Sequence, residues 1–182
     1  MSDLRSSLLG QYEVSSELAD PDCVIGFSFG TDTSMQGVNY RLAISAMACG
    51  DRATDYGYDA NVPTLMERML FDALPEWAEP SYVIETPISD TSAKQGGTWE
   101  VLRNAKAYMD EEGLSRPFLV AHAFLVGRVA AQAVMQGMQP VVRGGLPRHF
   151  DWSSQQWWTK HQALWIPREY IGQKVLKRRG QL

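Results

Sequence analysis

The 182-residue sequence has little of what defines several large classes of protein. It contains two cysteines, Cys23 and Cys49, so neither a disulfide-stapled fold nor a cysteine-built metal site is expected, and we interpret both as reduced structural thiols. Its apolar runs fall far short of the ~20 residues that a bilayer span needs. The segment Met1-Ser2-Asp3-Leu4-Arg5 does not begin a secretion signal. We therefore expect a cytoplasmic protein with no membrane partner.

Basic charge is also scarce. The chain has 17 Lys and Arg against 21 Asp and Glu, a formal net charge of −4, which argues against nucleic acid as a partner. It lacks the His, Cys and carboxylate spacings of zinc and iron sites and the lysine motif of a phosphate loop, so no metal is expected. Without a linker or low-complexity tract, residues 1–182 are predicted to form a single domain with its core at about residues 20–175.

Short apolar segments alternate with segments of helical spacing. Gly50, Gly113 and Gly137 are expected to end helices. This alternation is typical of a three-layer α/β fold, a Rossmann-like parallel sheet with helices on both faces. Strands are predicted at residues 22–29, 81–86, 117–121 and 139–143, and helices at residues 39–49, from Pro63 through 74, up to 113, and 123–136; residues 52–61 are a weak strand or a long loop.

The chain from Trp152 onward is predicted to be helical and aromatic. Trp158, His161, Gln162 and Trp165 fall on one helical face, which would belong to the core, line a ligand pocket or form a homodimer contact. The basic residues that follow indicate contact with phosphates or a membrane surface, or a solvated helix end. These basic residues are Lys174, Lys177, Arg178 and Arg179.

The first predicted strand runs into Gly26-Phe27-Ser28-Phe29-Gly30, at the sheet edge where ligands bind in open α/β folds. The pattern matches a nucleophile elbow, in which Ser28 would act with an acidic residue such as Asp90 and with His122. We favour a second interpretation, a glycine-rich loop whose backbone N–H groups approach an anionic ligand.

Two further turns bring polar side chains to the same edge. Thr98-Trp99-Glu100 opens a helix, and His122 follows the strongest predicted strand as a general base, an anion contact or a packed histidine. Arg128 lies near the start of a small-residue helix, where the helix dipole disfavours a cation unless it has a negative partner. That partner would be a ligand or an internal carboxylate, Glu85 or Glu100, and Arg41 has the same two interpretations.

The order of these segments resembles the SanA/YdcF-like family of bacterial domains. That family has a first strand ending in glycines, an Arg-Leu-x-x-Ala helix, a Thr-x-Glu-Asn turn and a Val-Thr-Ser-x-x-His-x-x-Arg turn. The similar segments here are Ile25–Gly30, Arg41-Leu42-Ala43, Thr98-Trp99-Glu100-Val101 and Val120–Arg128, with Arg168-Glu169-Tyr170-Ile171-Gly172 similar to the closing helix. Val101 and Leu125 stand where the family has Asn and His. The resemblance implies a Rossmann-like sheet and an anionic or nucleotide-type ligand, and it makes S-adenosylmethionine one candidate for a cofactor that the residues themselves do not name.

We therefore expect a domain that binds a small anionic or nucleotide-like metabolite and acts on it as a hydrolase or transferase. Backbone groups from Gly26 to Gly30 would contact the anion. Arg41 and Arg128 would recognise charge, Thr98 and Glu100 would orient the ligand, and His122 would transfer a proton. The alternatives are a serine hydrolase that uses Ser28 and a non-catalytic, partner-binding protein.

Overall fold

In the part of the chain that the structure describes, six parallel strands form one sheet in the order β1-β6-β5-β2-β3-β4. The computed structural model describes residues 13–15, 21–31, 33–35, 37–55, 62–85, 97–143, 146, 148, 150, 156, 159–180 and 182. The strands are β1 (Glu13–Ser15), β2 (Cys23–Gly26), β3 (Thr64–Glu67), β4 (Tyr82–Ile84), β5 (Pro117–Val120) and β6 (Val141–Arg143).

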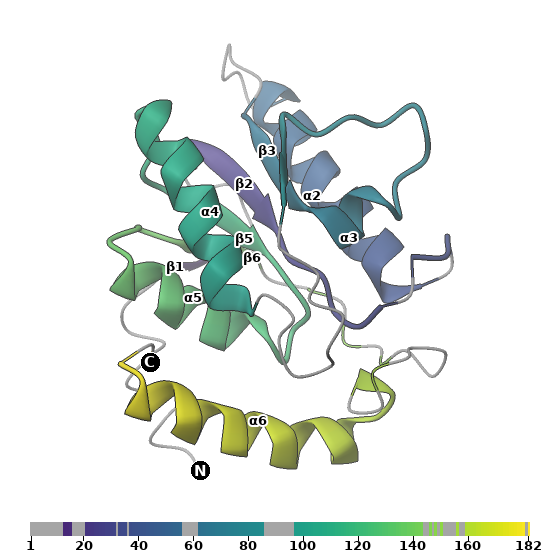
Figure 1. Cartoon of the computed structure of the whole chain (residues 1–182). Helices are drawn as coiled ribbons and strands as arrows, with labels where there is room; N and C mark the ends of the chain where they lie inside the picture. The colour runs from purple at the N-terminus through teal and green to yellow at the C-terminus, as the bar shows by residue number, and fades with distance from the viewer. Residues whose placement is uncertain are drawn as a thin grey trace.

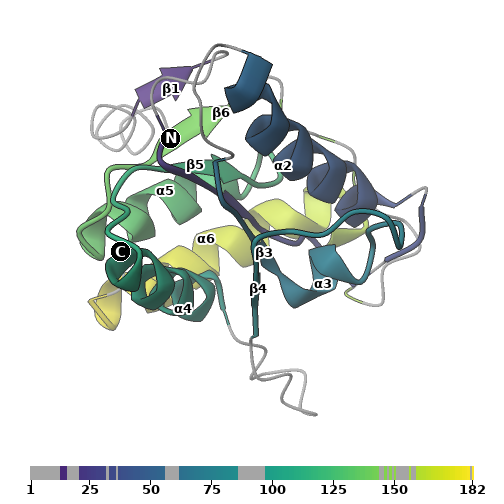
Figure 2. The same cartoon turned by 90° about the horizontal axis from the view of Figure 1, so that it is seen from above.

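Helices cover both faces of this sheet. The elements are α2 (Val38–Asp55), α3 (Arg68–Phe71), α4 (Thr98–Glu111), α5 (Val126–Met135) and α6 (Gln162–Arg178). Figure 2 shows α2 and α3 on one side of the sheet and α4 and α5 on the other. The predicted three-layer Rossmann-like fold is therefore confirmed. Among the described residues, no helix combines the length and the apolar character needed to cross a membrane.

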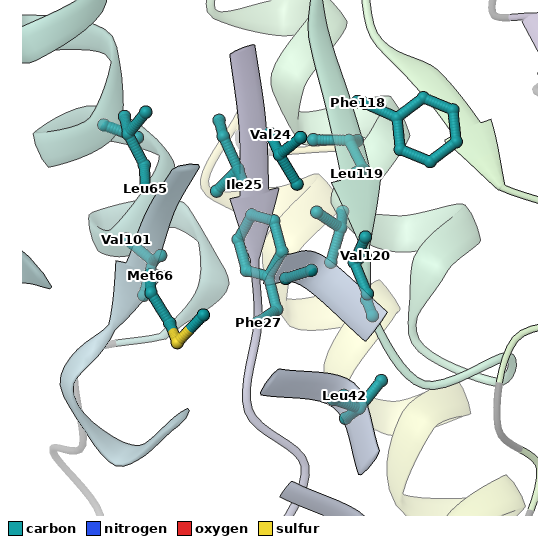
Figure 3. Close-up of a cluster of buried hydrophobic side chains, with 14 of the residues drawn as sticks. Val24, Ile25, Phe27, Leu42, Leu65, Met66, Val101, Phe118, Leu119 and Val120 are labelled. Atoms are coloured by element: carbon teal, nitrogen blue, oxygen red, sulfur yellow. The ribbon is translucent and has the colours of Figure 1, made fainter. Parts of the chain in front are cut away.

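The core is centred on three adjacent strands of the sheet, β3, β2 and β5. Ile25 is in register with Leu65 on one side and with Leu119 on the other, and all three side chains are fully buried. Figure 3 shows these side chains packed with others from the neighbouring strands. Apolar residues in succession suit strands covered on both faces. The predicted strands that contain Val24 and Ile25 and that contain Leu119 and Val120 are therefore neighbours at the centre of the sheet.

The glycines differ in what they do for the helices. Gly113 and Gly137 follow α4 and α5 with φ of +71° and +81°, the left-handed conformation predicted for helix ends. The predicted helix end at Gly50 is wrong, because α2 continues to Asp55. A Cβ at Gly50 would lie 2.6 Å from Thr64 Oγ1, so this glycine allows α2 to pack closely against the start of β3.

The predicted helix from Pro63 through Leu74 is also wrong. Thr64–Glu67 is a fully buried strand between β2 and β4, and only Arg68–Phe71 is helical. Leu65, Met66 and Glu67 are good helix formers, but pairing on both sides overrides their local preference. The edge strand β1 was not predicted at all.

The last helix, α6, lies outside the three layers. Figure 1 shows it across the end of the molecule toward which β2 points, which is the carboxyl edge of the sheet. Trp165 is its buried aromatic residue, whereas His161, the residue before the helix, and Gln162 are exposed. Trp158 and Trp157 lie outside the described residues. The predicted common face is therefore buried only at Trp165 among the described residues.

Candidate functional site

The strand order reverses between β2 and β5. From β2 the chain moves through β3 to β4 on one side, and after β4 it returns to β5 on the other side. Ligands of open α/β sheets bind at such a reversal, outside the carboxyl ends of the strands. Here the turn after β2 carries Ser28 and the turn after β5 carries His122, and Phe27 N–H bonds Val120 O at 2.9 Å between them.

The turn after β2 is held by a buried asparagine of α2. Phe29 N–H donates to Asn39 Oδ1 at 2.7 Å, and Asn39 Nδ2 donates to Gly30 O at 3.4 Å. Asn39 is fully buried, and Gly30 has φ of +84°, which suits glycine. Sequence reasoning missed this role of Asn39. The available signal was an Asn directly after a glycine-rich loop at a helix start.

Ser28 pairs with Glu67, the last residue of β3. The backbone N–H and the hydroxyl of Ser28 both donate to Glu67 Oε2 at 2.8 Å, and the hydroxyl also approaches Met69 Sδ at 3.9 Å. Glu67 is 8% exposed. Burial raises the pKa of its carboxyl, and the two hydrogen bonds from Ser28 partly oppose this rise.

This pairing bears on two expectations. The hydroxyl of Ser28 is directed to Glu67 and not to His122, and α2 begins only at Val38, so the geometry does not favour the nucleophile-elbow alternative. Glu67 was missed because its strand was assigned to a helix. The signal that could have found it is a carboxylate at the end of the short segment Thr64-Leu65-Met66-Glu67, which follows the first predicted helix.

His122 lies inside an aromatic cluster. Its fully buried ring stacks on Phe29 with centroids 3.8 Å apart, and the rings of Phe124 and Phe150 lie 5.7 Å and 5.2 Å away. Phe124 N–H donates to His122 Nδ1 at 3.3 Å, which leaves the proton of a neutral ring on Nε2. Trp165 of α6 joins the cluster, 4.8 Å from Phe29. The helix α6 therefore covers this turn with an aromatic side chain.

Arg128 forms a largely buried ion pair with α6. Its Nη1 lies 2.8 Å from Glu169 Oε2, and the two side chains are 12% and 11% exposed. Burial lowers the pKa of Arg128, and Glu169 opposes that fall. The Nε of Arg128 is buried without a hydrogen-bond partner among the described residues. Arg128 was expected to pair with a ligand or with an internal carboxylate, and the structure shows an internal carboxylate as its partner.

The prediction that Glu85 or Glu100 pairs with Arg128 is wrong. Glu85 pairs with Arg68 beside β4 and β3, and Glu100 lies half-buried in the first turn of α4. Glu169 was missed because it lies on the helix that docks from outside the sheet.

The other predicted site residues are spread around this edge. A Cβ at Gly26 would lie 2.9 Å from Leu70 Cδ1, so this glycine serves close packing inside the fold. Arg41 is exposed in the first turn of α2. The hydroxyl of Thr98 donates to Gln132 Oε1 of α5 at 2.6 Å, which ties it to the contact between α4 and α5. The structure therefore brings together Ser28, Gly30 and His122, and leaves Thr98 in a contact of its own.

Two positions differ chemically from the resembled family. Val101 and Leu125, where that family has Asn and His, are 1% and 3% exposed and belong to the apolar core. They supply no polar group to the edge. Any chemistry here must come from other side chains, such as Glu67, which ends β3, and Ser28 and His122, which follow β2 and β5.

The part of the chain that the structure describes holds no group of three or more His, Cys, Asp or Glu side chains that could bind a metal. Cys23 and Cys49 are buried, and neither belongs to a disulfide. Burial and the neighbouring carboxylate of Asp22 raise the pKa of the Cys23 thiol, which keeps it protonated and unreactive.

Comparison with known proteins gave no relative for this chain: no protein-family model, no curated protein and no solved structure matches it significantly.

Proposed function

We propose that the chain binds a small anionic, nucleotide-like metabolite at the carboxyl edge of β2, β3 and β5. The observation that carries this proposal is Glu67, a buried carboxylate that ends β3 beside the turn after β2. In nucleotide-binding domains of this architecture, an acidic residue near the end of the second strand accepts hydrogen bonds from ribose hydroxyls. Since β2 begins the strand-helix-strand unit, β3 is its second strand.

Glu67 already accepts hydroxyl hydrogen bonds. Its Oε2 holds the O–H of Ser28 at 2.8 Å, the kind of contact that a ribose hydroxyl would make. A vicinal diol entering this edge would replace or extend that contact, with Ser28 as the residue that holds Glu67 in place. Ser28 is a positioning residue in this proposal.

The anionic part of the ligand is assigned to the start of α2. The N–H groups of Phe27, Ser28 and Phe29 are all used internally, which moves the expected anion contact onward along the turn. The first turn of the 18-residue helix α2 directs its backbone N–H groups to the same edge, and Arg41 is exposed in that turn. Arg41 would therefore recognise the negative charge of the ligand.

The SanA/YdcF-like resemblance supports a ribose-containing ligand and adds S-adenosylmethionine to the candidates. Glu67 suits its ribose and Arg41 its carboxylate, and the bound compound would supply a methyl group for transfer. His122, with its proton on Nε2, would donate a hydrogen bond to a ligand atom in a hydrolase or transferase reaction at this edge.

Native mass spectrometry of the purified protein would first identify any co-purified metabolite. Calorimetry would then compare adenosine 5′-monophosphate, S-adenosylmethionine and 2′,3′-dideoxyadenosine 5′-monophosphate. Hydrogen bonds to a charged group contribute about 1.5–3 kcal/mol, so we expect the dideoxy compound to bind the protein ~10-fold or more weakly than the monophosphate.

Glu67→Gln should weaken binding of the monophosphate and reduce its advantage over the dideoxy compound. Glu79→Gln is the matched control, because Glu79 is exposed between α3 and β4, at the opposite end of the strands. Arg41→Ala should weaken the monophosphate more than adenosine. If none of the nucleotides binds, or if Glu67→Gln binds them all as the wild type does, the proposal is wrong.

A further inference from the structure

The helix α6 carries an unusual share of the exposed apolar surface. Nine large hydrophobic side chains are exposed in the described residues, and five of them lie on α6, including Tyr170 at 57% and Ile171 at 62%. Isolated exposed hydrophobic residues are normal, whereas a gathered patch indicates an interaction surface. The five residues are Leu164, Ile166, Tyr170, Ile171 and Val175.

These side chains occupy a broad arc of the helix. At about 100° per residue, Leu164, Ile171 and Val175 line one flank of α6, and Ile166 and Tyr170 line the other, so together they span roughly half of its circumference. Trp165 and Glu169 point the opposite way, because they are buried against the rest of the protein. Figure 1 shows α6 along one end of the molecule, with the sheet and its helices on one side of it.

The charge of this region is opposite to that of the whole chain. The protein has a formal net charge of −4, yet the only acidic residue between residues 160 and 180 is Glu169, which is buried in its ion pair with Arg128. The same stretch contains six cations: Lys160, Arg168, Lys174, Lys177, Arg178 and Arg179. The outer face of α6 is therefore apolar and positively charged, without an exposed carboxylate.

We infer that the outer face of α6 docks onto an anionic lipid surface. Helices that bind the membrane interface insert apolar side chains into the headgroup boundary while their Lys and Arg side chains contact anionic lipids, and the outer face of α6 offers side chains of both kinds. A partner helix would need a narrower apolar stripe, whereas half a circumference fits a planar, deformable surface. This inference departs from the expectation of no membrane partner, which rested on the absence of a spanning segment.

Lys174 and Tyr170 illustrate how the two kinds of side chain combine. The ammonium of Lys174 lies 4.4 Å from the ring centroid of Tyr170, so the charge sits above an aromatic ring on the exposed face. Tyr and Lys side chains both present an apolar body and a polar tip, which suits the boundary between headgroups and acyl chains. Docking by α6 needs no change in the sheet, and none of the five exposed apolar residues is assigned to the proposed metabolite site.

Vesicle flotation of the full chain tests this inference. The vesicles contain phosphatidylcholine alone, or phosphatidylcholine with one third phosphatidylglycerol. We expect the protein to float with the anionic vesicles at physiological salt, to bind the neutral ones far less, and to lose binding at high salt. Lys174→Glu with Lys177→Glu should lower the partition coefficient by ~30-fold or more, since each cation near an anionic surface contributes about fivefold. Ile171→Ser should lower it by roughly tenfold.

Each variant has a matched control elsewhere on the surface. Arg103→Glu with Arg148→Glu makes the same change in net charge at two exposed positions outside α6 and should leave flotation almost unchanged. Trp77→Ser removes a side chain that is 80% exposed on the loop between α3 and β4 and should also be neutral. Circular dichroism and the melting temperature of every variant should match the wild type, because all the replaced side chains are exposed.

Three results would overturn the inference. The first is no flotation with anionic vesicles, and the second is equal flotation with neutral and anionic vesicles. The third is a concentration-dependent dimer, measured by light scattering, that Ile171→Ser abolishes while flotation persists, since a second copy of the chain would then be the occupant of this face.

Discussion

The ion pair between Arg128 and Glu169 should be one of the strongest determinants of how α6 attaches to the protein. Both side chains are almost buried, at 12% and 11% exposure, and Arg128 Nε already lacks a hydrogen-bond partner among the described residues. Removing one partner of a buried pair leaves an uncompensated charge and costs about 3–5 kcal/mol. Glu169→Leu should therefore destabilise the protein by that amount, and Arg128→Met should do the same by leaving a buried carboxylate.

The double variant should be more stable than either single variant. Arg128→Met with Glu169→Leu replaces both charges by apolar groups next to Trp165, and such replacements are often neutral or stabilising. For a domain of this size, each kcal/mol shifts the melting temperature by about 2–4 °C, so the single variants should melt roughly 6–20 °C below the wild type. Urea unfolding followed by circular dichroism and tryptophan fluorescence would give all four free energies of the cycle.

An exposed pair provides the control for this cycle. Lys106 and Asp110 form an ion pair one turn apart on the surface of α4, and replacing either should cost less than about 0.5 kcal/mol. Single changes at Arg128 and Glu169 that cost no more than this, or no coupling between them, would refute the reasoning. If Arg128→Met instead lowers ligand affinity while the free energy of unfolding stays at the wild-type value, Arg128 is a ligand contact.

Three further changes test other parts of the structure. Gly50→Ala should destabilise the protein by about 1–3 kcal/mol, because its Cβ would lie 2.6 Å from the hydroxyl oxygen of Thr64 in β3. In urea unfolding, Gly172→Ala in α6 should instead stabilise the protein by up to ~1 kcal/mol, because its Cβ would meet only Arg128 Nη1, at an ordinary distance of 3.9 Å. The raised pKa of Glu67 means that folding favours its protonated form, so its contribution to stability is complete below the ordinary value of 4.5 and is lost as the pH rises through the folded-state value. The difference in free energy of unfolding between the Glu67→Gln variant and the wild type should therefore grow in favour of the variant from pH 4.5 upward and then level off. A difference that stays flat or falls with pH would contradict the burial argument. Once turnover is detected, Ser28→Ala and His122→Ala should each abolish the activity if the protein is a serine hydrolase, and combining them should add little. In the metabolite-site proposal, Ser28→Ala weakens ligand binding by about 1 kcal/mol, and His122→Ala lowers the rate by up to ~10²–10⁴-fold. Wild-type rates in both variants would exclude both residues from the mechanism.

The sequence predicted the parallel sheet because β2 and β5 are continuous apolar segments, a pattern typical of strands buried on both faces. It did not predict β3, since Leu65-Met66-Glu67 is followed directly by Arg68-Met69-Leu70 with no turn residue between strand and helix. The three residues of β1 become a strand only by pairing with β6. Local preference does not record such pairing.

Dependence on contacts between distant parts of the chain also decides which residues of the candidate site could be predicted. Ser28 and His122 follow strong strands, so their place at the carboxyl edge was predictable from the chain alone. Glu67 was lost together with its strand. The partner of Arg128 lies 41 residues away on a helix that docks across the sheet edge, and that docking is decided by the packing of Trp165 and the desolvation of two charges.

The position of β2 in the sheet also affects the order in which the protein can fold during synthesis. Ile25 is made early, and its first neighbour, Leu65, follows soon, but the other side of β2 waits for Leu119. Pairing between distant parts of a chain is slow, and an open apolar strand edge promotes aggregation in the meantime. A nascent chain that stops before β5 therefore leaves one edge of β2 unpaired, although all four residues of β2 are buried in the complete sheet. We expect protease resistance to appear on the ribosome abruptly, once β6 has emerged, and not in stages.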